Sequence, residues 1–245
     1  MYRKIMGFLE AWKENEHRKP LILQGARQVG KTYSILEFGR IHYENVAYFN
    51  FETNPKLNET FEEKISPDYL IPILSHIAGQ TIVKEKTLIV FDEVQLCERA
   101  LTSLKYFCED APDYHIIVAG SLLGVAVNRA KFSFPVGKVD MKTLYPMDME
   151  EFMIAMGEDE LVEQIKKCFE TNRPMPSALH DAAMQLYRQY LVVGGMPECV
   201  MQFVQTGDYI LIRHTQDTIL TSYLNDMGKY NNLNEIKKTR LAYDN

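Results

Sequence analysis

The 245-residue chain is 46% hydrophobic with a formal net charge of −6, which allows a sizeable core and gives no overall attraction to nucleic acid or anionic lipid. Its four cysteines form no C-x-x-C pair and its six histidines form no metal-binding motif, so we expect no transition-metal site. No apolar run reaches the roughly 18 residues of a membrane span and no signal peptide begins the chain, so we expect a cytoplasmic protein without a membrane partner.

A short apolar run followed by a glycine-rich loop is the first informative stretch. Residues 20–23 suit a buried parallel strand, and helical patterning over 33–38 ends near Gly39. Between them, GARQVGKT matches G-x-x-x-x-G-K-[ST], a loop whose backbone amides wrap phosphate where side chains are absent. We therefore predict a nucleotide site. The residues assigned to it are Gly25, Ala26, Arg27, Gln28, Val29, Gly30, Lys31, Thr32 and Tyr33.

Two side chains of this loop have predicted roles. Lys31 is expected to reach the β- and γ-phosphates and to contribute to catalysis, and the Thr32 hydroxyl to ligate Mg²⁺. The helix that begins here would aim its positive end at the phosphates. The pattern assigns no direction to the side chains of Arg27 and Gln28. ATP and Mg²⁺ are the predicted cofactors.

A second strand is predicted over 45–51, where β-branched and aromatic residues are frequent. Helical patterning then returns in 58–79. Pro67 and Pro72 interrupt it, so we expect two short helices that end at Gly79.

The next strand leads directly into two acidic residues. Residues 88–91 are all apolar, as a strand buried on both faces requires, and Asp92 and Glu93 follow. In an open parallel sheet the carboxyl ends of the strands form the ligand-binding edge, the same edge from which the glycine-rich loop springs. Asp92 is expected to hold Mg²⁺ through its water shell, and Glu93 to orient the attacking water. We therefore expect Lys31, Asp92 and Glu93 to meet around one triphosphate.

Two further strands complete a predicted five-stranded core. A helix over 99–109 precedes a strand over 114–119, and the last strand covers 139–145. Ser121 stands just past the first of these strands, where its hydroxyl would contact the γ-phosphate or the attacking water. A plain capping role is the alternative for Ser121.

From Pro146 onward the pattern is helical. Helices are predicted over 149–156, 159–169, 177–193, 197–205 and 208–227. The predicted fold class is α/β, a P-loop core with a five-stranded, mainly parallel sheet flanked by helices, followed by an all-α lid. We place the core with its N-terminal helix at 1–145 and the lid at 146–245. Tyr2, Arg3 and the turn at 193–198 are candidate positions for adenine contacts.

The order of these motifs resembles that of the AAA-type P-loop ATPases. The stretches RKPLILQGARQVGKT, LIVFDEVQ, VAGSLL, LYPMDMEEF and YLVVGGMPE resemble a family of prokaryotic ATP-binding AAA proteins, often with a nuclease-like C-terminal domain of unknown function. The resemblance covers about residues 1–225. It implies Mg²⁺-dependent ATP hydrolysis coupled to conformational change. Because such relatives are usually longer, we expect the C-terminal region to be truncated here, and the missing part to bind nucleic acid or protein.

One position departs from the family pattern. Relatives have Gly-Arg before the last core strand, and that arginine is suited to stabilising the γ-phosphate charge in a neighbouring subunit. This chain has Gly137-Lys138 at the same place. Lysine lacks the guanidinium fork, which weakens a catalytic role for Lys138. Arg129 is a second candidate, and for both the alternative is a surface cation. A homo-oligomer would follow from such a role.

Three other functions compete with an ATPase motor. GKVD at 137–140 resembles a guanine-binding motif but lacks its Asn or Thr, so ATP is favoured over GTP. A small-molecule kinase needs no water-orienting acid at Glu93. A nucleotide-gated switch or scaffold with slow hydrolysis shares the same binding residues and stays open.

Overall fold

The computed structural model describes residues 1–120 and 135–229 of the chain. The chain divides into two compact units. One is Arg3–Tyr145, and the other is Pro146–Asn245 together with Met1–Tyr2. Within the described residues, no helix is both long enough and apolar enough to cross a membrane.

A five-stranded sheet forms the centre of the first unit, and its strands run in the order β2-β3-β4-β1-β5. Every neighbouring pair is parallel, so all five carboxyl ends lie at one edge. The order puts β4 between β1 and β3. The strands are β1 (Leu21–Gln24), β2 (Asn45–Asn50), β3 (Thr87–Asp92), β4 (His115–Gly120) and β5 (Asp140–Thr143).

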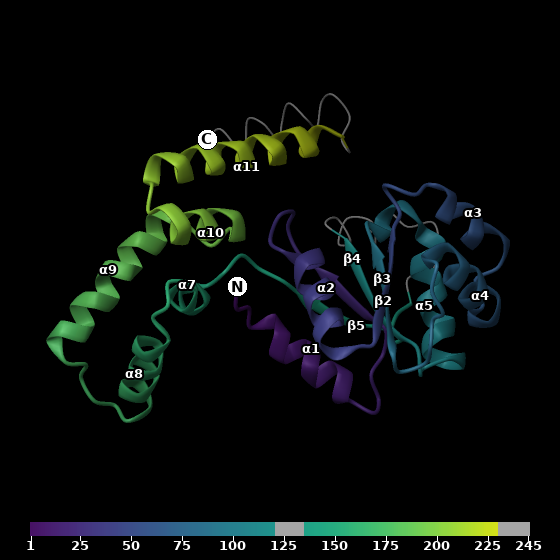
Figure 1. Ribbon diagram of the computed structural model, residues 1–245, viewed down its shortest axis with the longest axis horizontal. Coiled ribbons are helices and arrows are strands. Elements are labelled where there is room, and N and C mark those ends of the chain that lie inside the picture. The colour runs from purple at the N-terminus through teal and green to yellow at the C-terminus, as the bar shows by residue number, and fades with distance from the viewer. Residues whose placement is uncertain (121–134, 230–245) are drawn as a thin grey trace. The chain divides into compact units, whose positions relative to one another are not determined.

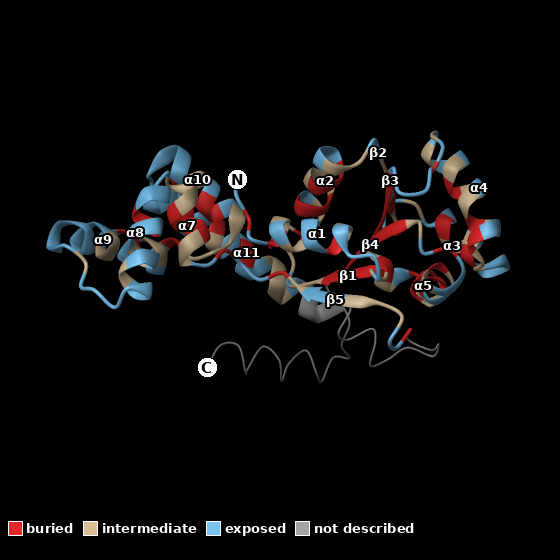
Figure 2. Cartoon of the chain, turned by 90° about the horizontal axis from the view of Figure 1, so that it is seen from below, coloured by how far each residue is buried: buried red, intermediate tan, exposed pale blue. Residues whose placement is uncertain are grey.

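Helices cover both faces of this sheet (Figure 1). On one face lie α1 (Ile5–Glu14) and α2 (Lys31–His42), and on the other lie α3 (Lys56–Glu63), α4 (Pro67–Ala78) and α5 (Glu98–Asp110). Because both faces are covered, β3 and β4 are buried along their whole length, whereas β5 at the edge is only partly covered (Figure 2). The predicted α/β fold class is therefore confirmed.

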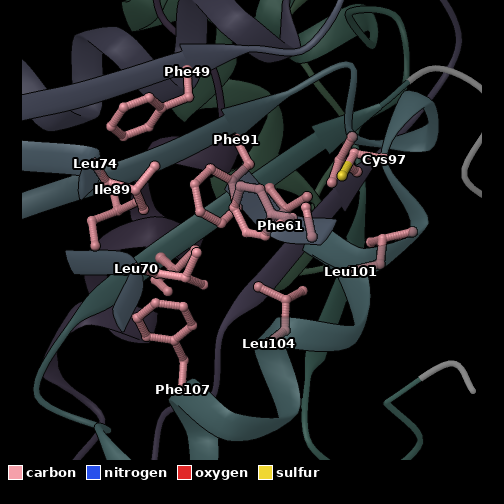
Figure 3. Packing of buried hydrophobic residues seen from close by; sticks show 14 of the residues in the cluster. Phe49, Phe61, Leu70, Leu74, Ile89, Phe91, Cys97, Leu101, Leu104 and Phe107 are labelled. Atoms are coloured by element: carbon pink, nitrogen blue, oxygen red, sulfur yellow. The ribbon is translucent and has the colours of Figure 1, made fainter. Parts of the chain in front are cut away.

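Phenylalanine rings hold the sheet against α3 and α5 (Figure 3). Phe91 of β3 is the centre of this packing: Phe61 meets it edge-on with ring centroids 5.7 Å apart, and Phe49 lies 5.9 Å away. All three side chains are almost completely buried. Rings at this spacing add specific contacts to the burial of apolar area, so β3 is held firmly just before its acidic end.

Two helix boundaries differ from the prediction. Pro72 does not interrupt α4, which runs from Pro67 to Ala78, because the break between the two helices falls at 64–66. Likewise, α2 continues through Gly39 to His42. Gly39 is packed closely against β2, since a Cβ added to it would lie 2.5 Å from Val46 Cγ2, so glycine serves packing at this position and not helix termination.

The second unit is helical in its described part: α7 (Met149–Ala155), α8 (Asp159–Glu170), α9 (Ser177–Val193), α10 (Pro197–Thr206) and α11 (Tyr209–Lys229). A capping box of Asp148 and Glu151 begins α7. Phe152 packs against Phe203 with ring centroids 6.3 Å apart. The turn before α10 is tied to the start of the unit, because the Met147 amide donates to the Gly195 carbonyl at 2.7 Å.

A buried histidine lies where β4 begins, at the amino-terminal edge of the sheet. His115 is 4% exposed, and its Nδ1 lies 2.7 Å from the Tyr43 hydroxyl. Burial lowers the pKa of His115 from 6.5 to about 4, and the charges of Arg18 and Lys13 add to this effect.

This histidine should make the stability depend on pH. The unfolded chain takes up the proton near pH 6.5 and the folded chain only near pH 4. Stability should therefore fall as the pH drops through this window, by about 2 kcal/mol once solvent screening is allowed for. Denaturant unfolding between pH 7 and 4.5 measures it, with His115→Gln as the reference. Equal slopes in both proteins would contradict the assignment.

Candidate functional site

The carboxyl edge of the sheet brings the glycine-rich loop and the acidic strand end together. Gln24, the last residue of β1, is in register with Gly120 of β4, and Phe91 of β3 is in register with Val118 of β4. Thus β1 and β3 end at nearly the same level on either side of β4, and the loop that follows β1 faces Asp92.

One hydrogen bond joins the two motifs directly. The Thr32 hydroxyl donates to Asp92 Oδ2 at 2.8 Å across 60 residues of sequence. Asp92 is 4% exposed, and its Oδ1 accepts the backbone amide of Glu93 at 2.9 Å. A buried carboxylate needs such donors because it has lost its water.

The amine of Lys31 lies over the loop. Its Nζ donates to the carbonyl oxygens of Gly25 at 2.9 Å and Ala26 at 2.7 Å. Burial lowers the pKa of Lys31 below its usual value of 10.5, while the negative charges of Glu93 and Asp92 oppose this effect. The amine therefore lies within the field of both acids, and the three side chains expected to meet are gathered at one edge.

The loop needs glycine at its first position. Gly25 has a φ of +154°, and a Cβ there would lie 2.2 Å from the carbonyl oxygen of Leu144, next to β5. The loop is also supported from outside by the buried Arg3, which donates to the carbonyl oxygens of Val29 and Tyr145, each at 2.8 Å. The sequence suggested Arg3 only as an adenine contact, and no local pattern reveals this support.

Replacing Gly25 with alanine should therefore destabilise the protein by about 2–3 kcal/mol, since the Leu144 backbone cannot move aside cheaply. Denaturant unfolding measures the change. Gly7→Ala is the matched control: its Cβ would meet nothing within 4 Å in α1, so alanine should raise stability by up to about 1 kcal/mol. A Gly25→Ala protein as stable as wild type would contradict this account of the loop.

Glu93 has a special backbone conformation, with a φ of +53°. It precedes a short 3₁₀ helix, Val94–Leu96. The Glu93 carboxylate accepts a hydrogen bond from the Gln95 side-chain amide. No sequence motif points to Gln95.

Tyr48 also contacts the site. Its hydroxyl donates to Asp92 Oδ2 at 2.8 Å from the outer strand β2. Burial raises the pKa of Tyr48 to about 12, together with the neighbouring acids, so the phenol keeps its proton at neutral pH. The only local signal for it was an aromatic residue in a strand, which is ordinary.

The remaining predicted residues lie as follows. Tyr33 is 58% exposed in the first turn of α2. Lys138 precedes β5 at the amino-terminal edge and forms an ion pair with Glu109 at 2.9 Å, away from the loop of its own chain. Any role in a neighbouring subunit stays a prediction. Ser121 and Arg129 lie outside the described residues.

The parallel sheet, the glycine-rich loop after β1 and the acid at the end of β3 define a P-loop nucleotide-binding protein of the ATPase class. The sequence supports a more specific assignment. Residues 17–153, more than half of the chain, match the model of a family described as AAA domain, and the protein belongs to that family. Residues 184–244 match a second model, described as a domain of unknown function.

The chain is similar to several solved structures. The Walker-type ATPase PABY2304 of Pyrococcus abyssi is 16% identical with a TM-score of 0.55, and the match covers 93% of this chain and 75% of that one. The RuvB Holliday junction branch migration motor of Thermotoga maritima is 13% identical with a TM-score of 0.44, and the match covers 98% of this chain and 67% of that one. The ORC2 protein of Aeropyrum pernix is 14% identical with a TM-score of 0.42, and the match covers 64% of this chain and 52% of that one. No curated protein sequence matches the chain.

Proposed function

We propose that this protein binds ATP with Mg²⁺ at the carboxyl edge of the sheet, hydrolyses it to ADP and phosphate, and passes the change to its helical unit. The observation that carries the proposal is the 2.8 Å hydrogen bond between Thr32 and Asp92. It joins a phosphate-binding type of loop to an acidic strand end, the two parts that a Mg²⁺-nucleotide site requires.

The loop fits a phosphate group. Helix α2 begins at Lys31 after Gly30, whose φ is +89° and which has no side chain to cap the helix. The first amides of α2 therefore lack partners within the helix and carry its positive dipole end. The Lys31 amine, now bound to two loop carbonyls, supplies a full positive charge beside them. Both features suit a polyanion.

The metal would be held by few protein atoms. Among the described residues there is no group of three or more His, Cys, Asp or Glu side chains placed for a metal ion. Mg²⁺ commonly uses one or two protein ligands together with substrate phosphates and waters, which fits the Thr32 hydroxyl and Asp92. Bound Mg²⁺ would neutralise charge on the phosphate oxygens.

Glu93 is our choice for the residue that orients the attacking water. It follows Asp92 directly at the end of β3, on the sheet edge that carries the glycine-rich loop, and its negative charge opposes the lowering of the Lys31 pKa by burial. In hydrolysis the water oxygen bonds to the γ-phosphorus and the bond to the ADP oxygen breaks. The water proton leaves toward the carboxylate, which acts as base.

A second candidate function is a nucleotide-gated switch with slow hydrolysis. The hydrogen bond from Gln95 to the Glu93 carboxylate favours it, because Gln95 competes with the attacking water for one of the two carboxylate oxygens. Both functions predict the same nucleotide binding. They differ in turnover, which is slow for a switch.

The deciding experiment measures binding of a fluorescent ATP analogue and release of phosphate, each with and without Mg²⁺. Micromolar binding together with Mg²⁺-dependent phosphate release supports the ATPase, and binding with negligible release favours the switch. Absence of nucleotide binding would overturn both. Activity and particle size over a range of protein concentrations test the predicted homo-oligomer, because a site completed by a neighbouring subunit gains specific activity as subunits associate.

A further inference from the structure

Tyr48 reaches the candidate metal site from a strand that carries none of the predicted site residues. It lies on β2 in register with Val90, two residues before the acidic end of β3. Its side chain is 38% exposed, yet its hydroxyl lies 2.8 Å from Asp92 Oδ2. This is the same oxygen that accepts the Thr32 hydroxyl.

The direction of the Tyr48 proton is determined by its other contact. The Asn50 side-chain amide donates to the Tyr48 oxygen at 3.2 Å. A phenol has one proton, and because its oxygen already accepts from Asn50, the proton is free to point at Asp92. Asn50 is itself in register with Asp92 across the β2–β3 pair. Through the Tyr48 hydroxyl, the three side chains form one short chain of hydrogen bonds.

Among the described residues, the Asp92 carboxylate accepts from three donors that come from different parts of the chain. Thr32 of α2 and Tyr48 of β2 donate to Oδ2, and the Glu93 amide donates to Oδ1. Thr32 and Glu93 already have proposed roles toward metal and water, whereas Tyr48 has none. When Thr32 turns its oxygen to a metal, Tyr48 can still hold the carboxylate in place.

We propose that Tyr48 is a positioning residue for the metal site, which keeps Asp92 Oδ2 turned toward Thr32 so that the acid is already oriented when Mg²⁺-nucleotide arrives. The inference rests on the proposed function of this site. It concerns orientation alone, because the contacts observed for the Tyr48 hydroxyl are with Asp92 and Asn50. A rotating carboxylate would bind the water shell of the metal less well, because its orientation must then be restricted on binding.

Tyr48→Phe tests this cleanly, since it removes the hydroxyl and keeps the ring. The half-saturating Mg²⁺ concentration for binding of a fluorescent ATP analogue should rise about fivefold. Nucleotide affinity in EDTA should stay within about twofold, and so should the phosphate-release rate at saturating Mg²⁺. A purely structural role would shift all three quantities together.

Tyr43→Phe is the matched control. It removes a tyrosine hydroxyl with a similar 2.7 Å contact, to His115 at the opposite edge of the sheet, and it should leave Mg²⁺ dependence unchanged. An unchanged Mg²⁺ midpoint in Tyr48→Phe, or an equal loss of binding in EDTA, would overturn the inference while the proposed function stands. Wild-type protein that binds no nucleotide would overturn the proposed function as well.

Discussion

Replacing Lys31 with alanine is expected to weaken ATP binding by at least about 100-fold, because charge-assisted contacts in a buried site are worth several kcal/mol. In the described structure its amine is held over the loop by the carbonyls of Gly25 and Ala26, ready to turn to an anion. Equilibrium binding of a fluorescent ATP analogue measures the loss. Unfolding in denaturant, followed in parallel, shows whether the variant still folds.

Lys84→Ala is the control for this loss. Lys84 forms an exposed ion pair with Asp113 at 3.0 Å, so its removal should leave ATP binding unchanged. If a folded Lys31→Ala protein bound ATP as tightly as wild type, the loop would not be the phosphate site, and the proposed function would be wrong.

The second large effect is expected from Glu93→Gln. Turnover should fall by about 100-fold or more, the usual contribution of a positioned general base, while the affinity for ATP stays within about twofold. Glutamine keeps the size of the side chain and loses its basicity. Phosphate release and nucleotide binding, measured on the same preparation, separate the two quantities.

Glu98→Gln is a suitable control, because Glu98 lies in the first turn of α5 and should not affect turnover. Unchanged turnover in Glu93→Gln would remove Glu93 from the proposed mechanism. If the protein acts as a switch, the same variant should retain its biological output, since binding alone drives it.

Local sequence was sufficient to predict the structure wherever the functional residues and the backbone conformation that they need lie within a few residues of each other. The apolar run before Gly25 and the helix after Gly30 are visible because strand burial, positive φ and helix initiation each require particular residue types. The same holds for the buried strand that ends at Asp92. Together with the other predicted strands, the helical pattern after Pro146 and the three later stretches that carry the family resemblance, they predicted the fold class and the family.

Local rules were wrong where packing outweighs propensity. Pro72 is tolerated inside α4 and Gly39 inside α2. In both cases the helix is supported along its length by the sheet, and the single unfavourable residue costs less than the burial of its neighbours gains. The position of a proline or glycine in the sequence does not show whether the burial of its neighbours outweighs its cost to the helix.

The sequence by itself determined the glycine-rich loop and the acidic strand end, because each motif requires particular residue types at fixed local spacing: glycine, lysine and threonine in the loop, and paired acids after the strand. Only the tertiary structure decided that β4 separates β1 from β3, that Thr32 bonds to Asp92, and that Tyr48 and Arg3 support the site from distant segments. The reason is physical: strand order and long-range hydrogen bonds depend on how whole faces pack together, and no short stretch of chain encodes its partner's position.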